Sequence, residues 1–510
     1  MATIYQQDSH SQESIVTVTT SQSSTVTHIS QDSNDKKSIS SYESTATAYD
    51  LELNTYLPKE EPYSVFTGRQ KLLIVSICCL TGIVSPLSAN IYFPALNAIE
   101  KDLKTTTELI NLTVTVYMIF QGISPSFWGS LADIWGRRPV YLGTLMVYMC
   151  SCVGLAKAPV YWVLLVMRML QAFGSSSVIA IGAGVVSDIA TPSERGGYFG
   201  IFSMGQMLGP VIGPVLGGII SQKLTWRWIF WVLLMLGGAL FLAIFFLLPE
   251  TLRSLVGNGS GYANATLWKY HAEHHDVHKT NRFLQLPKVS RPFLYLVQKD
   301  VIVALVYNGI HYATYYSYLT STPSLLATRY RLNEIQVGLC FLCQGTGCIL
   351  GSFVQGRLLD RDFRKVLDEG FSSEGQNEIP IFKVRFRSMY HNAAVIQMIT
   401  LFYGWMVQIN AHLAVILVLQ FCVGFANTGM FNVFQTLMVD LFPANSASIT
   451  ATNNLVRCLL GAVATMSVEP GIQRLGPGWM FTLLGLVCVA SNGLVPILLV
   501  YGPRWKSLRE

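Results

Sequence analysis

The sequence predicts an all-α membrane protein in which twelve transmembrane helices form two six-helix bundles. Hydrophobic residues make up 51% of the 510 residues and charged residues only 13%, whereas soluble domains carry about 25% charged residues. Apolar runs long enough to cross a bilayer recur along the chain, and Lys and Arg are distributed unevenly among the loops between them. These three observations exclude a soluble globular fold.

The chain opens with a polar segment that we expect to be a disordered cytoplasmic tail over residues 1–65. Stretches such as "TVTTSQSSTVTHISQDSNDKKSISSYESTATAYD" contain almost nothing that a folded core would bury. No positively charged segment followed by an apolar core opens the chain, so we expect no cleavable signal peptide. The first apolar run would then direct membrane insertion itself.

Twelve apolar runs follow, and each reaches or approaches the about 20 residues that a bilayer core requires. The runs cover residues 70–92, 107–128, 139–156, 159–182, 198–220, 227–249, 300–322, 335–356, 389–408, 412–435, 449–468 and 478–501. The domains that we expect are an N-terminal bundle over 66–250, a central cytoplasmic loop over 251–299, a C-terminal bundle over 300–501 with a cytoplasmic insert at about 361–388, and a cytoplasmic C-terminus over 502–510.

The distribution of basic residues predicts the orientation. With the N-terminus inside, the inner segments from Arg69 onward hold 22 Lys and Arg, and the outer loops hold 8. Cytoplasmic loops of membrane proteins carry such an excess of positive charge. The mildly basic balance therefore reflects membrane topology, and we expect no nucleic-acid partner.

Two loops share a short pattern, which suggests an internal duplication. "GSLADIWGRRPV" begins at Gly129 after the second run, and "GRLLDRDFRKV" begins at Gly356 after the eighth. Both contain G-x-L-x-D, with the acid at Asp133 and at Asp360. Two sets of six spans, with the same G-x-L-x-D pattern in the corresponding loop, are typical of transporters built from repeats.

The first of these loops combines charge with tight-turning glycines, Gly129 and Gly136. An Asp at a helix N-terminus and an Arg that reaches a neighbouring helix can form a latch between two bundles on the cytoplasmic side. Asp133, Arg137 and Arg138 supply these groups. The alternative is that the arginines act only as a topology signal.

The loop also resembles a known family. "GSLADIWGRRPVY" is similar to the loop signature of the major facilitator superfamily, with Ile134 where a basic residue is usual. "RMLQAFGSSSVI" resembles its fourth-span signature, with Ala172 replacing a glycine, and "GQMLGPVIGPVLGG" resembles the fifth-span signature of the drug:proton antiporters, with Pro214 replacing a glycine. The resemblance covers residues 66–505 approximately and is closest to the fungal quinidine-resistance-type branch of the twelve-spanner antiporters.

The resemblance implies a plasma-membrane exporter that works by proton antiport and alternating access, and not an enzyme. We expect an amphiphilic, cationic or neutral cargo, because a cavity rich in Tyr, Phe and Met suits a loose substrate range. The alternatives are an exporter of an endogenous metabolite such as a polyamine, and a non-transporting membrane sensor with a carrier fold. Protons and the lipid bilayer are the other expected partners, the protein is expected to be a monomer, and no cofactor or metal is expected.

The fifth apolar run is unusually rich in helix breakers. Glycines recur every four residues along one helix face, which lets another helix approach closely, and two prolines each remove a backbone hydrogen bond. These residues are Gly205, Gly209, Pro210, Gly213, Pro214 and Gly217. The pattern predicts a close-packed, kinked hinge, and the resemblance implies that this helix seals the outer half of the pathway.

Ionisable groups within the apolar runs are candidate functional residues, because charge inside a membrane is expensive. The resemblance assigns proton coupling to Arg168, which Gln171 follows by three residues. A structural role as partner of a backbone carbonyl is the alternative. Arg457 is the other buried cation, and His311 is either a titrating group or a hydrogen-bonded core histidine.

No acid occupies the membrane portion of the first run, where many members of the resembled family carry one. Asn90 stands there, in "LSANIYFPAL". Proton coupling must then use another group, and the acids near the lipid boundary are Asp133, Asp188 and Glu469.

Overall fold

The computed structural model describes residues 63–191, 194–259, 294–370, 381–387, 389–442 and 446–508. The chain separates into two units, Met1–Glu61 and Pro62–Glu510, and every described residue belongs to the second. The predicted tail up to residue 62, residues 260–293 of the predicted central loop and residues 371–380 of the predicted insert lie outside the described residues.

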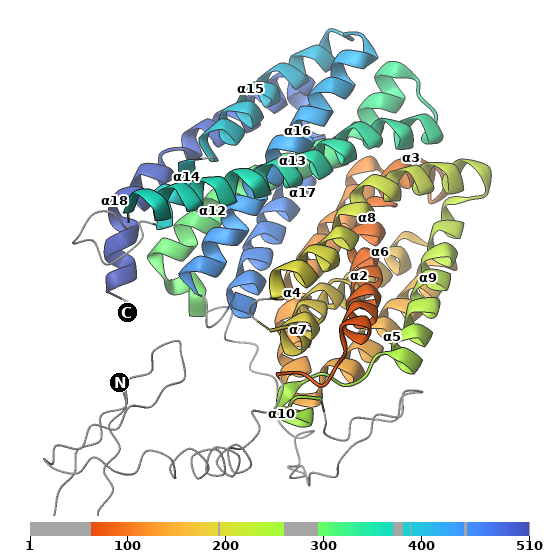
Figure 1. Cartoon of the computed structure of the whole chain (residues 1–510). Coiled ribbons are helices and arrows are strands. Elements are labelled where there is room, and N and C mark those ends of the chain that lie inside the picture. Colours follow the sequence, from red (N-terminus) through yellow and green to blue (C-terminus); the bar gives the residue numbers. More distant parts are fainter. Residues whose placement is uncertain are drawn as a thin grey trace, which may run out of the picture. The chain divides into compact units, whose positions relative to one another are not determined.

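The described residues are helical, with no strand among them, and Figure 1 shows their arrangement. We call α2 to α10 the first half: α2 (Gly68–Asn90), η1 (Phe93–Ala95), α3 (Leu96–Asp102), α4 (Thr107–Trp135), α5 (Arg137–Ala156), α6 (Tyr161–Ser175), α7 (Ser177–Ile189), α8 (Arg195–Lys223), α9 (Trp226–Leu247) and α10 (Arg253–Val256). The second half comprises η3 (Tyr295–Val297), α12 (Lys299–Tyr330), α13 (Glu334–Gly370), α14 (Ile381–Arg387), α15 (Met389–Gln408), α16 (Leu413–Leu441), α17 (Ser446–Ser491) and α18 (Leu494–Ser507).

All twelve predicted apolar runs fall on these helices. The fourth run is divided between α6 and α7. The segment α17 comprises two helices that meet at a kink at Gly476, where φ is 79°; the eleventh run lies before this kink, and the twelfth lies after it and continues into α18. Glycine tolerates this left-handed backbone without a steric penalty. Eight helical stretches in the described part are long and apolar enough to cross a membrane. The all-α membrane fold class is confirmed.

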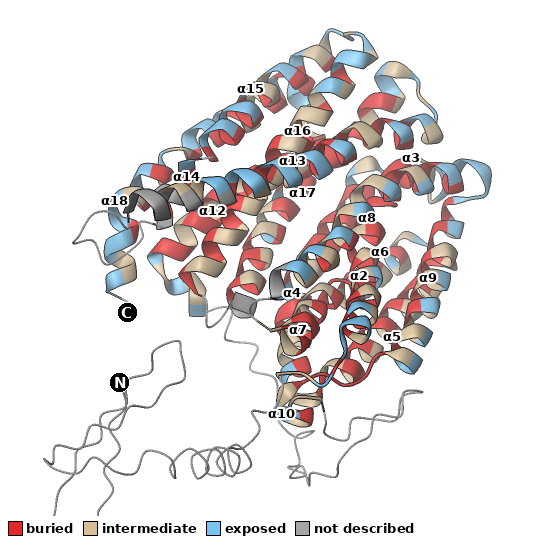
Figure 2. Cartoon of the chain, viewed as in Figure 1, coloured by how far each residue is buried: buried red, intermediate tan, exposed pale blue. Residues whose placement is uncertain are grey.

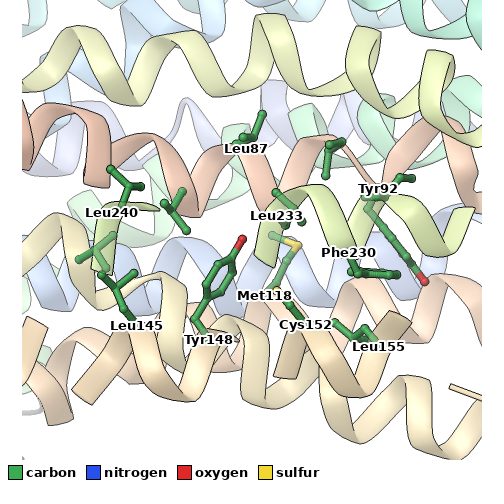
Figure 3. Packing of buried hydrophobic residues seen from close by; sticks show 14 of the residues in the cluster. Leu87, Tyr92, Met118, Leu145, Tyr148, Cys152, Leu155, Phe230, Leu233 and Leu240 are labelled. Carbon is green, nitrogen blue, oxygen red and sulfur yellow. The ribbon is translucent and has the colours of Figure 1, made fainter. Parts of the chain in front are cut away.

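The burial pattern is that of helices surrounded by lipid. Large side chains fill the interior of the first half, among them Tyr148 of α5 and Leu233 of α9, which are both labelled in Figure 3. Large apolar residues are also exposed, and Figure 2 shows exposed stretches along α9, α13 and α15. Met235 and Leu242 of α9 are 59% and 54% exposed. Helices that are apolar on every side are stable where hydrocarbon replaces water.

Two helix pairs form the main contact between the halves: α4 packs on α17, and α8 packs on α13. The 29 residues of α4 span about 43 Å, which is close to the full thickness of a bilayer. We call the end where α4 finishes the Asp133 end, and the end where α4 begins the Glu469 end.

Direct contacts between the halves are concentrated toward the Glu469 end. The hydroxyls of Thr115 on α4 and Thr465 on α17 are 2.9 Å apart. At the very end, the Ile335 amide donates to the side-chain oxygen of Gln222 at 3.0 Å. The structure therefore describes a conformation in which the halves are held together at this end.

Candidate substrate and coupling site

Arg137 is the centre of an ion-pair cluster at the Asp133 end. Its guanidinium lies 2.7 Å from the carboxylate of Asp133 and 3.0 Å from that of Asp188. The side chains of Arg137 and Asp188 are each 12% exposed, whereas that of Asp133 is 64% exposed. The cluster joins α4, α5 and α7, which all belong to the first half. This differs from the expected latch, which was to hold the two bundles together.

The N-terminus of α5 is capped by Glu250, which follows α9. Its carboxylate accepts hydrogen bonds from the backbone amides of Arg137, Arg138, Thr251 and Leu252, at 2.8 to 3.1 Å. A carboxylate at a helix N-terminus satisfies free amides and complements the helix dipole. Asp133 had been expected at a helix N-terminus, but it lies near the C-terminal end of α4.

The two loop glycines have different surroundings. Gly136 adopts a φ of 111°, and a Cβ there would collide with the Glu250 carboxylate. A Cβ on Gly129 would meet nothing within 4 Å, so close packing does not require glycine there. Arg138 instead reaches α9, where it donates to the backbone oxygen of Phe245 at 2.6 Å.

The second half contains a corresponding ion pair that the sequence reading missed. Arg385 on α14 lies 2.7 Å from Asp440 at the end of α16. Asp188 and Asp440 each precede a proline by a few residues, in "SDIATP" and "VDLFP", and this shared pattern is the signal that was available. The side chain of Asp360, the acid expected from the duplication, lies outside the described residues.

Lys71 and Glu194 form another unpredicted pair at the Asp133 end. The Lys71 ammonium donates to the Glu194 carboxylate at 2.8 Å, and this hydrogen bond lowers the pKa of Glu194. The pair ties the beginning of α2 to the residue preceding α8. Nothing in the local sequence pattern connects two residues so far apart in the chain.

The glycine stripe of α8 lies against α2. A Cβ on Gly205 would collide with the backbone oxygen of Cys79, and one on Gly209 would lie 2.7 Å from the backbone nitrogen of Leu87. Gly213 and Gly217 meet the backbone around Ile91 in the same way. The predicted close approach is thus present. The helix is continuous through Pro210 and Pro214.

A second set of small residues brings α8 against the other half. A Cβ on Gly338 of α13 would collide with the backbone oxygen of Pro214, and one on Gly345 would lie 2.9 Å from the Cα of Val211. Gly218 of α8 similarly faces the backbone of Glu334. The helix α8 therefore lies between α2 of its own half and α13 of the other half. The sequence pattern had predicted only the first of these contacts.

Arg168 is buried inside the first half, with 1% of its surface exposed. Its guanidinium lies between the rings of Tyr92 and Tyr117, at 4.0 and 4.2 Å from their centroids. It donates to the side-chain oxygen of Gln171 at 2.7 Å and to the backbone oxygen of Ser88 at 3.4 Å, and its Nε has no partner. Cation–π contacts offset part of the cost of burying this charge.

Arg457 of α17 has similar surroundings in the second half. Its guanidinium lies over the rings of Tyr312 and Phe431, at 4.4 and 4.6 Å from their centroids. It donates to the side-chain oxygen of Asn454 at 2.7 Å, and its Nε is buried without a partner. Asn454 in turn donates to the backbone oxygen of Gln121 on α4, so this group lies at the boundary between the halves.

Neither arginine has a carboxylate partner in the part of the chain that the structure describes. The five ion pairs there involve other cations. A buried cation without a counter-ion is costly, and a guanidinium with free N–H groups matches the geometry of a carboxylate. Each of the two arginines is therefore a buried positive charge with aromatic rings around it, an arrangement that is suited to an anion.

His311 and Glu469 form hydrogen bonds with residues other than these two arginines. His311 is buried on α12, where its Nδ1 lies 3.0 Å from the backbone oxygen of Tyr307, four residues earlier. Its Nε2 has no partner. Glu469 is 8% exposed and accepts a hydrogen bond of 3.3 Å from Ser324 of α12.

Residues 78–465 match the family model described as Major Facilitator Superfamily. The chain belongs to the Major Facilitator Superfamily. It is therefore a membrane transporter and not an enzyme. Within the superfamily it is 39% identical to Citrate exporter 1 of Aspergillus niger, and the match covers 93% of each chain.

Another relative within the superfamily is MFS antiporter QDR1 of Candida albicans, which is 34% identical over 89% of this chain and 92% of its own length. The predicted resemblance to quinidine-resistance-type antiporters is confirmed. Among solved structures, the human organic anion transporter MFSD10 (TETRAN) matches with a TM-score of 0.56 over 83% of this chain and 99% of that one, at 14% identity. At that identity the similarity concerns the fold alone.

Proposed function

We propose that this transporter exports a small organic anion across the plasma membrane, in exchange for protons and by alternating access. The observation that carries the proposal is the pair of buried arginines, Arg168 and Arg457, each between two aromatic rings and each without a carboxylate partner in the described residues. The name of the relative Citrate exporter 1 supports the same chemistry. This cargo differs from the cationic or neutral compound expected from the sequence.

A series of neighbouring tyrosines connects the two arginines and supports a single binding site that includes both. The Tyr117 ring covers Arg168, and Tyr117 lies within electrostatic range of Tyr316 and of Cys458, the neighbour of Arg457. Tyr316 packs on the Tyr312 ring at 4.6 Å, and Tyr312 covers Arg457. A small separation of the halves at α4 and α17 would let one polycarboxylate approach both guanidinium groups.

The proposed orientation places the Asp133 end in the cytoplasm. Lys71, Arg137, Arg138, Arg253 and Arg385 lie at or beside that end of their helices, in agreement with the positive-inside rule. Contacts that hold the halves together at the other end then correspond to a carrier closed toward the outside. The glycine contacts of α8 with α13 support the outer seal that the family resemblance implies.

Efflux of amphiphilic drugs is a second candidate function. The rings of Tyr92, Tyr117, Tyr312, Tyr316 and Phe431 offer stacking surfaces that suit a cationic or neutral amphiphile, and MFS antiporter QDR1 is a relative. Two uncompensated positive charges in the same region oppose a cationic cargo by Coulomb repulsion.

Flux from proteoliposomes distinguishes these two candidates. Vesicles would be preloaded with labelled citrate or with a labelled lipophilic amine, and efflux would be followed with and without an imposed proton gradient. Anion export predicts gradient-dependent citrate efflux that other polycarboxylates compete with and the amine does not. Gradient-dependent efflux of the amine alone would contradict it and favour the second candidate.

A further inference from the structure

A cavity of about 600 Å³ lies between the halves at the Glu469 end. The first half contributes Asn97, Glu100 and Thr107 to its lining, and the second half contributes residues of α12 and α17, including Ser324 and Glu469. The side-chain nitrogen of Asn97 donates to the backbone oxygen of Pro323 at 3.4 Å, which joins the halves beside the cavity. Glu469 is thus a carboxylate buried at the point where the two halves close.

Like charges of the first half face this carboxylate. Glu100 of α3 and Glu108 of α4 lie within electrostatic range of Glu469, and Glu100 is held toward the cavity by a hydrogen bond of 2.9 Å from Thr107. The basic side chains at the cavity, Lys101 and Arg329, are exposed and form no ion pair with Glu469 in the described structure. An ionised Glu469 would therefore meet repulsion when the end closes, and a proton on Glu469 removes it.

Glu469 is also connected to the arginine site by a single helix face. Arg457, Gly461, Thr465 and Glu469 follow one another at intervals of four residues on α17, so they form one slowly drifting stripe. Gly461 packs on Met118 of α4, and Thr465 contacts Thr115 of α4. The 12 residues from Arg457 to Glu469 correspond to about 18 Å along the helix. The α4–α17 contact therefore lies on the stripe between Arg457 and Glu469.

We propose that closing the Glu469 end takes up one proton from the outer solution on the carboxylate of Glu469. This inference rests on the proposed transport function and its orientation, and it names the group through which outer pH acts. When the end opens, Glu469 returns the proton to water and becomes a carboxylate. When the end closes, the carboxylic acid shares the cavity with Glu100 without like-charge repulsion. Low outer pH therefore favours the closed conformation.

The test uses a reporter cysteine at a position that is buried when the end is closed. Thr115→Cys in the full-length protein would be labelled by a membrane-impermeant maleimide added outside, at a series of outer pH values. The labelling rate would be corrected at each pH for the fraction of the thiol that is ionised. We expect the labelling rate to fall as pH falls, by up to about tenfold per pH unit because one proton is linked to the equilibrium. Glu469→Gln should give slow, pH-independent labelling. Glu469→Asp should keep the pH dependence.

The control variant is Lys157→Gln, which removes an exposed charge of the same end that does not line the cavity, and it should behave like the unmodified protein. The proposal is overturned if Glu469→Gln keeps the full pH dependence, or if Glu469→Asp is as insensitive to pH as Glu469→Gln. Exchange of labelled citrate without a pH gradient is measured in parallel. If the unmodified protein shows no citrate exchange, the proposed anion transport is contradicted. The labelling experiment still decides whether Glu469 binds the proton, because it does not depend on the cargo.

Discussion

At the scale of single residues, the two acids that bind Arg137 differ in the free energy they contribute. Removing the mostly buried partner, by Asp188→Asn, should lower the free energy of unfolding by about 3 kcal/mol, because the mostly buried Arg137 then keeps only its exposed partner Asp133. Asp133→Asn removes an exposed partner and should cost about 1 kcal/mol or less. Thermal unfolding of the purified variants in detergent measures both. Equal decreases in the unfolding temperature of the two variants would show that burial does not determine which ion pair stabilises the protein more.

Glu250 offers a second prediction at this scale. Glu250→Ala leaves four backbone amides without their acceptor and should destabilise the Asp133 end by about 2 kcal/mol. Glu250→Gln retains one acceptor oxygen and should lose less. Protection of the amides of Arg137 and Arg138 from hydrogen exchange is the measurement. Unchanged protection in Glu250→Ala would show that the cap does not stabilise α5.

The sequence predicted individual polar residues better than their partners. Arg137 was identified from its loop, but its buried partner on α7 and the cap from beyond α9 depend on how distant helices pack. Arg168 and Arg457 stood out because charge is rare in apolar runs. Their aromatic neighbours were not predicted, since Tyr92, in the turn after α2, and Phe431, on α16, lie far along the chain from these arginines and no local pattern connects them.

At the scale of helices, α8 provides a matched pair of glycine substitutions. Gly209→Val places a side chain 2.7 Å from the backbone of α2, and such overpacking typically costs about 1–3 kcal/mol. Gly200→Val, in the same helix, adds the same side chain where nothing lies within 4 Å. Transport should fail in the first variant and persist in the second, at equal abundance in the membrane. Equal transport by both would contradict a need for close packing at α2.

Helix positions were predictable because hydrophobic run length alone determines them in a membrane. The interruption between α6 and α7 was not predictable from hydropathy. The break at Gly476 in α17, by contrast, lies between the last two predicted runs. The contact between α8 and α13 was missed because glycines of both helices create it together.

At the scale of the whole molecule, movement of the halves can be tested by a cross-link. The Thr115 and Thr465 hydroxyls are 2.9 Å apart, so Thr115→Cys combined with Thr465→Cys should form a disulfide that holds the Glu469 end closed. Transport should stop on oxidation and return on reduction, while each single variant remains active. Full transport by the cross-linked protein would contradict alternating access through this end.

The central claim is that the carrier binds an anion through Arg168 and Arg457. Equilibrium binding of labelled citrate to the purified protein tests it most directly, with Arg457→Gln, Arg168→Lys and the exposed control Arg504→Gln measured beside it. A charge-assisted contact of about 1.5–3 kcal/mol predicts that Arg457→Gln weakens binding roughly 10- to 100-fold. Arg168→Lys should bind with intermediate affinity, and Arg504→Gln should match the unmodified protein. Citrate binding of unchanged affinity in Arg457→Gln, or saturable binding of a lipophilic amine but not of citrate, would contradict the account.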